Sequence, residues 1–196
     1  MYLIVGLGNP ETSYRNTRHN VGFRVIDLWS RDLGARLTKR RFQSKNVQAR
    51  YKDKKLMLLC PLTFMNRSGA SVRACADYFN LDSRNILVIH DDLDLMVGRI
   101  KVARNGGNGG HRGVASVIKH LGTMEFPRVK IGIGRPRYSE AVEDYVLRPF
   151  YGDERNTMEN MLSVAVKACK LFVSEGVEQA MNRINCLKIP DIVSGN

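Results

Sequence analysis

Polar side chains with acid–base and hydrogen-bonding capacity follow several apolar segments of the chain. Each stands just past a predicted strand or just before a predicted helix, and the set is Asn9, His19, Asn66, Asp91 and Asp92. A histidine exchanges its proton near neutral pH, a carboxylate can orient the imidazole ring, and an amide can donate to an oxygen that gains negative charge. Such a set is a candidate for one pocket with acid–base and hydrogen-bonding capacity. The alternative is that each residue serves only its own turn, because Asn and Asp favour turns.

The position of His19 favours a role in a site. The stretch TRHNVGF places it in the turn that enters a helix predicted from about residue 21, and not on the buried face of that helix. A base must project from a loop into a wet cleft, so this is a suitable place for one. Ligands of open α/β sheets bind beyond the carboxyl ends of the strands, where Asn9, Asn66 and Asp91 stand. We count Arg18, the neighbour of His19, with the same predicted site.

A glycine-rich segment over residues 105–113, NGGNGGHRG, leads directly into a predicted helix. Glycines let a backbone approach a bulky ligand, and a helix N-terminus can receive a phosphate. The flanking cations Lys101, Arg104 and Arg112 favour an anion, whereas glycine content alone fits a flexible surface loop equally well. His111 in this segment can contact a phosphate or simply cap the helix that follows.

Several other kinds of site are disfavoured. The VGLGNPE loop has Glu11 where a dinucleotide-binding motif has its third glycine, and no helix follows it at once. The chain has no G-x-S-x-G elbow, and Cys60 before Pro61 fits a buried apolar residue better than a nucleophile. The remaining histidines, His90 and His120, fit a core position and a helix end. No histidine pair has H-x-x-x-H spacing, so we expect no metal site.

Composition indicates a polyanionic partner and a reducing compartment. The chain has 196 residues, a formal net charge of +12 and a pI of about 9.8, which favours a partner such as RNA, DNA or an anionic membrane over a basic surface that only water covers. Its four cysteines are scattered, as expected in the cytosol. The N-terminus does not resemble a signal peptide, and no segment reaches the apolar length of a membrane span.

Strands and helices alternate along the chain. This predicts a single three-layer α/β/α globular domain over residues 1–196, with a twisted, mostly parallel mixed central sheet and a frayed tail after about residue 186. The hairpin near residues 46–60 makes the sheet mixed, and residues 135–144 fit a mobile loop. Predicted strands cover residues 2–7, 45–51, 54–61, 85–90, 98–104 and 128–136, and the alternation over 98–104 is typical of an exposed strand. Predicted helices cover residues 21–33, 68–81, 114–122 and the region from about 153 to 184.

Seven motifs occur in order along the chain, and together they resemble bacterial-type peptidyl-tRNA hydrolases from nearly the first residue to about position 185. The motifs are LIVGLGNP, Y-x-x-T-R-H-N-V-G, P-L-T-F-M-N-x-S-G, HDDLDL, GGNGGHRG, RVKIGIGRP and YVLRPF. The resemblance implies a cytoplasmic α/β/α enzyme that needs no metal or organic cofactor. It implies hydrolysis of the ester between a peptide and the acceptor end of tRNA, which recycles peptidyl-tRNAs dropped from the ribosome. We expect a monomer that does not bind membranes.

The resemblance also implies residue roles. His19 matches the family's catalytic base, and Asp91 matches the carboxylate that supports it. Asn9 and Asn66 match asparagines that position the substrate and stabilise the oxyanion. Tyr14 and Phe64 match contacts to the tRNA end. His111 and Arg112 also fall at substrate-binding positions, and we expect Asn66 to bind substrate as well.

One position departs from the family pattern. The family commonly has asparagine where this chain has Arg112, and an arginine cannot accept a hydrogen bond. Arg112 can still hold a phosphate, so we expect hydrolysis with altered tRNA handling, and a tRNA arm bound near the glycine-rich segment and residues 135–137. The alternatives are an RNA-binding splicing partner of the same ancestry without hydrolase activity, and a nucleotide-dependent α/β enzyme.

Overall fold

The computed structural model describes residues 1–187 and 189, and within them seven strands form one sheet. The strand order is β2-β3-β4-β1-β5-β7-β6. The central strands β4, β1, β5 and β7 are parallel, whereas β2, β3 and β6 pair antiparallel with their neighbours. The strands are β1 (Tyr2–Gly6), β2 (Lys39–Arg41), β3 (Ser44–Tyr51), β4 (Lys54–Pro61), β5 (Ile86–Asp92), β6 (Ile100–Ala103) and β7 (Arg128–Gly132).

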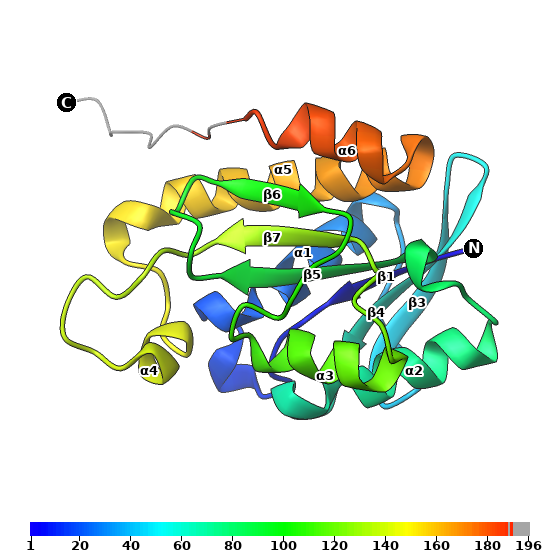
Figure 1. The fold of residues 1–196 in the computed structure, drawn as a ribbon, viewed down its shortest axis with the longest axis horizontal. Helices are drawn as coiled ribbons and strands as arrows, with labels where there is room; N and C mark the ends of the chain where they lie inside the picture. The colour runs from blue at the N-terminus through cyan, green and yellow to red at the C-terminus, as the bar shows by residue number, and fades with distance from the viewer. Residues whose placement is uncertain (188, 190–196) are drawn as a thin grey trace.

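Helices cover both faces of this sheet, so the predicted three layers are present (Figure 1). Helices α1, α5 and α6 lie on one face, and α2 and α3 lie on the other, with the short α4 near the carboxyl ends of the strands. The helices are α1 (Val21–Asp32), α2 (Ser68–Tyr78), α3 (Arg112–Leu121), α4 (Val142–Val146), α5 (Arg155–Glu175) and α6 (Val177–Ile184). No helix among the described residues is long and apolar enough to cross a membrane.

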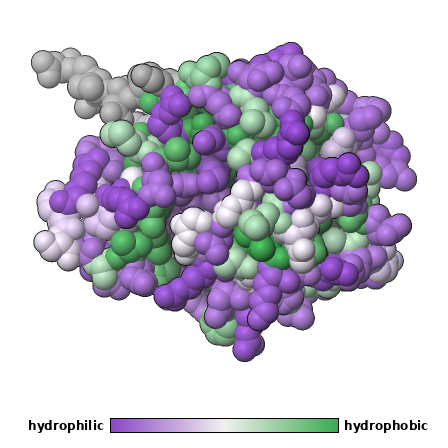
Figure 2. Space-filling view, viewed as in Figure 1, coloured by the Kyte–Doolittle hydropathy of each residue, from purple (hydrophilic) through white to green (hydrophobic). Residues whose placement is uncertain are grey.

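The core is divided between the two faces by the alternation of side chains along each strand. Ile4 and Leu58 pack under α1 and α5, whereas Leu3 and Val5 pack under α2 and α3. Because the central strands are buried on both faces, their sequences are nearly continuous apolar runs. The surface that covers them is mostly hydrophilic on the face shown in Figure 2, with hydrophobic side chains in separate patches.

The close approach of α1 to β1 fixes the turn that carries His19. Gly6 of β1 faces Gly22 of α1, and a Cβ atom at Gly6 would lie 2.2 Å from the Gly22 carbonyl oxygen. Glycine at both positions therefore lets the first turn of α1 lie directly on the strand. His19, two residues before α1 begins, is thereby held beside the carboxyl end of the sheet.

The strands and helices predicted from the sequence are confirmed, with three corrections. The short edge strand β2 was not predicted, and α4 occupies part of residues 135–144, where we expected only a loop. Segment 98–104, expected to be an exposed strand, has a buried face made by Ile100 and Val102. The expected frayed tail falls mainly on residues 188 and 190–196, which lie outside the described residues.

Candidate active site

His19 lies in a 3₁₀ turn, Arg18–Asn20, and Arg18 anchors this turn to residues 145–154, which are distant along the chain. The Arg18 guanidinium is fully buried, donates 2.7 Å to the Pro149 carbonyl and forms an ion pair of 3.3 Å with Glu154. It also stacks on the Tyr145 ring at 3.8 Å. The prediction that Arg18 belongs to the pocket is therefore wrong, because the residue instead fixes the backbone from which His19 projects.

The imidazole of His19 faces the carboxylate of Asp91, which ends β5. Nδ1 of His19 lies 3.0 Å from each of the two carboxylate oxygens, and the two side chains are 12% and 4% exposed. Since an ionised carboxylate only accepts hydrogen bonds, Nδ1 carries the proton and donates it to Asp91. The other ring nitrogen, Nε2, then holds the lone pair that a general base needs.

His111 forms a second hydrogen bond to the same carboxylate. It is the N-cap of α3, and its Nδ1 accepts from the backbone N–H groups of Gly113 at 3.1 Å and Val114 at 3.2 Å. An acceptor at Nδ1 leaves the proton on Nε2, which lies 3.0 Å from Asp91 Oδ1 and donates to it. Both ring nitrogens of His111 are thus occupied within the protein, and the ring orients Asp91.

The charges of this cluster shift the two central groups in opposite directions. Burial disfavours the charged form of His19, but the charge of Asp91 and its hydrogen bond outweigh burial and the repulsion by Arg112, so the pKa of His19 is raised above its ordinary value of 6.5. Burial would raise the pKa of Asp91, but His19 and His111 hold this pKa well below its ordinary value of 3.8. Asp91 is therefore an anion throughout the range in which His19 titrates.

His90 stands next to this cluster but is a core residue in its contacts. Its ring is buried, its Nδ1 donates to the backbone carbonyl of Asp91 at 2.6 Å, and the T-shaped contact to His111 places the two ring centroids 5.0 Å apart. Burial, followed by repulsion from His111, lowers the pKa of His90 to about 3. His90 is therefore neutral at physiological pH.

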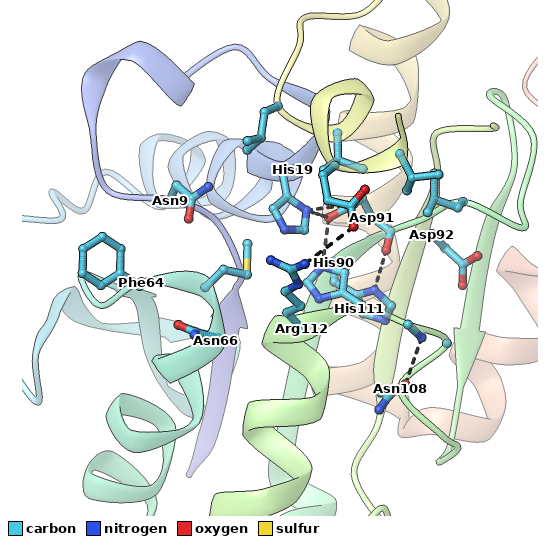
Figure 3. Close-up of a pocket in the computed structure, with 18 of the residues that line it drawn as sticks. Asn9, His19, Phe64, Asn66, His90, Asp91, Asp92, Asn108, His111 and Arg112 are labelled. Atoms are coloured by element: carbon cyan, nitrogen blue, oxygen red, sulfur yellow. Dashed lines mark hydrogen bonds and ion pairs between the residues drawn. The ribbon is translucent and has the colours of Figure 1, made fainter. Parts of the chain in front are cut away.

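A pocket of about 580 Å³ opens in front of His19 and Asp91 (Figure 3). Asn9 and His19 reach it from the segments after β1, and Phe64 and Asn66 come from the loop after β4. Phe64 is 65% exposed at the rim. The pocket therefore joins a buried acid–base pair, two amide side chains and an exposed aromatic ring, the groups expected for hydrolysis of a substrate with a planar base.

Asn20 fixes the backbone of Asn9 from both sides. The Asn9 N–H donates to Asn20 Oδ1 at 2.8 Å, and Asn20 Nδ2 donates to the Asn9 carbonyl at 2.9 Å. Asn20 is the N-cap residue of α1, but its side chain makes no capping hydrogen bond. The Asn20 amide binds the backbone of Asn9, so the side-chain amide of Asn9 is available to the pocket.

The structure brings together all the predicted site residues except Arg18 and Tyr14. The pocket lining includes Asn9, His19, Phe64, Asn66, Asp91, His111 and Arg112. Tyr14 lies in a separate 3₁₀ turn, Thr12–Tyr14, and is not part of this lining. Arg112 is 72% exposed and faces Glu143 at 3.6 Å, so its guanidinium remains accessible at the mouth.

The pocket residues that were not predicted from the sequence include Met65 and three apolar residues on and just after α4. Met65 lines the pocket and stands between two predicted site residues in the sequence. Its apolar side chain has no acid–base or hydrogen-bonding group that would mark it as a site residue. Val142, Val146 and Leu147, on and just after α4, also line the pocket. Val142 lies in the segment expected to be a mobile loop, and Val146 and Leu147 directly follow that segment, so only the fold shows that they line the pocket.

The ligand atoms of His19, Asp91 and His111 lie within 4.8 Å of one another, a spacing that suits a metal ion. However, each histidine already donates to Asp91, and His111 Nδ1 is held by the backbone of α3. A metal at this position would have to replace those hydrogen bonds. The protonation pattern therefore fits an acid–base cluster better than a ligand set.

Comparison with known proteins agrees with this geometry. Residues 3–191 match the family model described as peptidyl-tRNA hydrolase. The chain is 42% identical over 189 residues to a peptidyl-tRNA hydrolase of Clostridium botulinum strain Hall, covering 96% of this chain and 99% of the relative. It is 44% identical over 185 residues to a peptidyl-tRNA hydrolase of Carboxydothermus hydrogenoformans, covering 94% of this chain and 98% of the relative.

The similarity extends to the fold. A crystal structure of peptidyl-tRNA hydrolase from Acinetobacter baumannii superposes with a TM-score of 0.91 at 36% identity, covering 97% of each chain. Sequence motifs, family model and full-length structural similarity agree, and the matched residues include those that form the pocket. The chain therefore belongs to the peptidyl-tRNA hydrolase family.

Proposed function

We propose that the protein hydrolyses the ester bond between a peptide, or an N-blocked amino acid, and tRNA, and so recycles peptidyl-tRNAs released from the ribosome. The observation that carries the proposal is the hydrogen bond from His19 Nδ1 to Asp91, which frees His19 Nε2 to act as a base at the pocket floor. Family membership defines the substrate class, and the pocket supplies the groups for the reaction.

His19 Nε2 takes a proton from water as the water oxygen attacks the ester carbonyl carbon. Asp91 stabilises the imidazolium that forms, and His111 keeps the carboxylate in place. The tetrahedral intermediate then collapses, the ester C–O bond to the ribose breaks, and the leaving oxygen receives the proton from His19. General base catalysis of this kind contributes about 10²- to 10⁴-fold in rate.

Asn66 stabilises the oxyanion, and Asn9 recognises the peptide. The Asn66 amide donates to the carbonyl oxygen as it gains negative charge, and a donor of this type is worth about 3–4 kcal/mol in comparable sites. The Asn9 amide oxygen accepts from the first peptide N–H of the substrate. A free aminoacyl ester has a charged amine in place of that N–H, so Asn9 favours peptidyl-tRNA over aminoacyl-tRNA.

The acceptor end of the tRNA binds at the rim. Phe64 stacks on a terminal base, and Arg112 holds a backbone phosphate through its exposed guanidinium. Because Tyr14 stands outside the pocket lining, we assign the stacking contact to Phe64 alone. His111 acts on the substrate only through Asp91.

We also propose that the reaction runs in the cytoplasm, without a metal or an organic cofactor, in a monomer. The pocket is lined by residues of one chain, and the protons within the cluster of His19, Asp91 and His111 occupy the positions that a metal would need.

Purified protein incubated with N-acetylaminoacyl-tRNA and, separately, with the unblocked aminoacyl-tRNA tests the proposal. We expect release of the N-acetyl amino acid and free tRNA in the first reaction, at a rate well above that of the second. Binding of tRNA without release would contradict the proposal and favour a non-catalytic RNA-binding role.

A further inference from the structure

Several cations on the glycine-loop side of the pocket pair with carboxylates, whereas Lys101 and Arg112 remain exposed. Arg135 pairs with Asp94, Arg104 pairs with Glu178, and Lys130 pairs with Asp92 at 3.0 Å. Arg137 likewise bridges Asp153 and Glu154. The region near residues 135–137, where the sequence predicts tRNA binding, therefore offers little excess positive charge.

The hairpin of β2 and β3 has many cations and no carboxylates to neutralise them. Between Asp32 and Asp53 the chain has no carboxylate at all. The exposed cations of this segment are Arg36, Lys39, Arg40, Arg41, Lys45, Arg50 and Lys52. Within the part of the chain that the structure describes, none of Lys39, Arg40, Arg41 and Lys45 lies within 4.0 Å of a carboxylate.

The positive charge of the hairpin destabilises the sheet, and the fold does not need this charge. Arg40 and Lys45 are directly opposite each other on β2 and β3, and like charges at opposite positions destabilise a sheet. Charged residues do protect an edge strand from pairing with other chains, but alternating signs would give the same protection without repulsion. The repulsion therefore points to an external anion as the partner of these side chains.

The hairpin is also held in a rigid and strained form. Phe42 and Gln43 link the strands with φ angles of 55° and 50°, which non-glycine residues rarely adopt. Ser44 Oγ and Asn46 Nδ2 both donate to the Arg41 carbonyl, at 2.6 and 3.0 Å. The Arg41 guanidinium lies 3.8 Å from the ring centroid of the exposed Tyr78. A basic strand with an aromatic surface beside it is a common way to bind a nucleic-acid backbone.

The hairpin is connected to the active site by contacts and by a second cleft. The Leu62 N–H donates to the Gln43 carbonyl at 2.7 Å, two residues before Phe64 at the rim. A cleft of about 520 Å³ begins at Asn9, which also lines the catalytic pocket, and extends to Lys45. Carboxylates inside the cleft offset its arginines, so the excess positive charge lies at its far end, on the hairpin.

We propose that the β2–β3 hairpin binds the sugar–phosphate backbone of the substrate tRNA beyond its acceptor end, with Arg40 and Lys45 as the main phosphate contacts. The proposal rests on the proposed function for the identity of the RNA. When the acceptor end of a tRNA is bound in the pocket, the rest of that tRNA is the polyanion closest to the hairpin. The hairpin thus contacts the body of the tRNA, while the pocket contacts only its acceptor end.

Two matched double variants test the proposal. Arg40→Gln/Lys45→Gln removes the opposed pair near the pocket. Arg50→Gln/Lys55→Gln removes another directly opposed pair of exposed cations from β3 and β4, about 16 Å farther along β3 at 3.3 Å per residue. Both variants lose the same charge and relieve the same kind of repulsion, so thermal unfolding should show neither variant to be less stable than the wild type.

The first measurement is the Kd for deacylated tRNA at several NaCl concentrations. We expect Arg40→Gln/Lys45→Gln to weaken binding by at least about 5-fold near 0.1 M salt and to reduce the slope of log Kd against log salt by about 2. The control pair should change Kd by less than about 2-fold, because it lies outside the proposed contact. Equal losses in both variants, or none in the first, would overturn the proposal.

The second measurement compares kcat/KM for N-acetylaminoacyl-tRNA with that for the same ester on the acceptor-end trinucleotide. Arg40→Gln/Lys45→Gln should reduce the preference for whole tRNA, mainly through KM, and an equal loss on both substrates would overturn the proposal by placing the residues in the pocket. Deacylated tRNA binds whether or not the protein is a hydrolase. Failure of the proposed function, seen as no turnover by the wild type, is thus distinguishable from failure of the hairpin proposal.

Discussion

Asp91→Asn isolates the contribution of the carboxylate to the base. In the wild type, both carboxylate oxygens lie 3.0 Å from His19 Nδ1, and Oδ1 also accepts from His111. An asparagine with its oxygen at the Oδ1 position can still accept hydrogen bonds from both histidines. Its N–H₂ group, however, then lies against the His19 Nδ1–H, so two donors face each other. The opposite orientation places a donor against His111. The amide therefore either moves the His19 proton to Nε2, which destroys the base, or displaces the ring.

The magnitude follows from these two effects. Loss of the correct tautomer and of the stabilised imidazolium should reduce kcat by about 10²- to 10³-fold, equivalent to about 2.7–4.1 kcal/mol. Burial lowers the pKa of His19 and Asp91 raises it, so the substitution should move this pKa below its wild-type position. A base must be neutral, so the rate of the wild type falls as the pH drops through the raised pKa. In Asp91→Asn this acid limb should shift to lower pH.

Initial rates of N-acetylaminoacyl-tRNA hydrolysis from pH 5 to 8 measure both effects. Asp92→Asn is the matched control, because Asp92 makes its ion pair of 3.0 Å with Lys130 and not with His19. The acid limb of the control should remain at the wild-type pH. An Asp91→Asn enzyme with wild-type kcat, or with an unshifted acid limb, would refute the assignment of Asp91 as the partner of the base.

Three further predictions concern the surroundings of the base. His111→Ala removes the cap of α3 and one hydrogen bond to Asp91, so urea denaturation should show a loss of about 1 kcal/mol, and kcat should fall while KM is kept; unchanged kcat would show that His111 does not position Asp91. Arg112→Asn removes a charge that opposes protonation of His19, so the acid limb of kcat/KM should move to higher pH while turnover persists, and a shift to lower pH would contradict the electrostatic account. Dialysis against EDTA should leave turnover unchanged, and activity restored only by an added divalent ion would show that the cluster of His19, Asp91 and His111 holds a metal.

The sequence predicts most of the fold because the buried strands have strong local signals. Strands β1, β4 and β5 are nearly continuous apolar runs, and α1 places Val25, Ile26 and Trp29 on one buried face. Strand β2 has no such signal, since all of its residues are exposed cations. It forms because it pairs with β3, which is a tertiary contact that no local pattern records.

The candidate site is predicted in part, and the missing part depends on long-range contacts. Polar residues after strand ends are expected to meet at one edge of the sheet, and His19 and Asp91 do. Arg18 carries no sign of burial in its own segment, because its carboxylate partner, Glu154, is 136 residues away. His111 caps α3 and contacts Asp91 at once, which requires the backbone of α3 to lie beside Asp91. The residues around His111 in the sequence leave both phosphate contact and helix capping open, and the structure shows the cap.

The most direct test of the account is the single-turnover rate of His19→Ala on N-acetylaminoacyl-tRNA, measured beside its Kd for deacylated tRNA. The account predicts a rate reduced by about 10²- to 10⁴-fold with tRNA binding close to that of the wild type. Wild-type turnover in this variant would show that His19 is not the base.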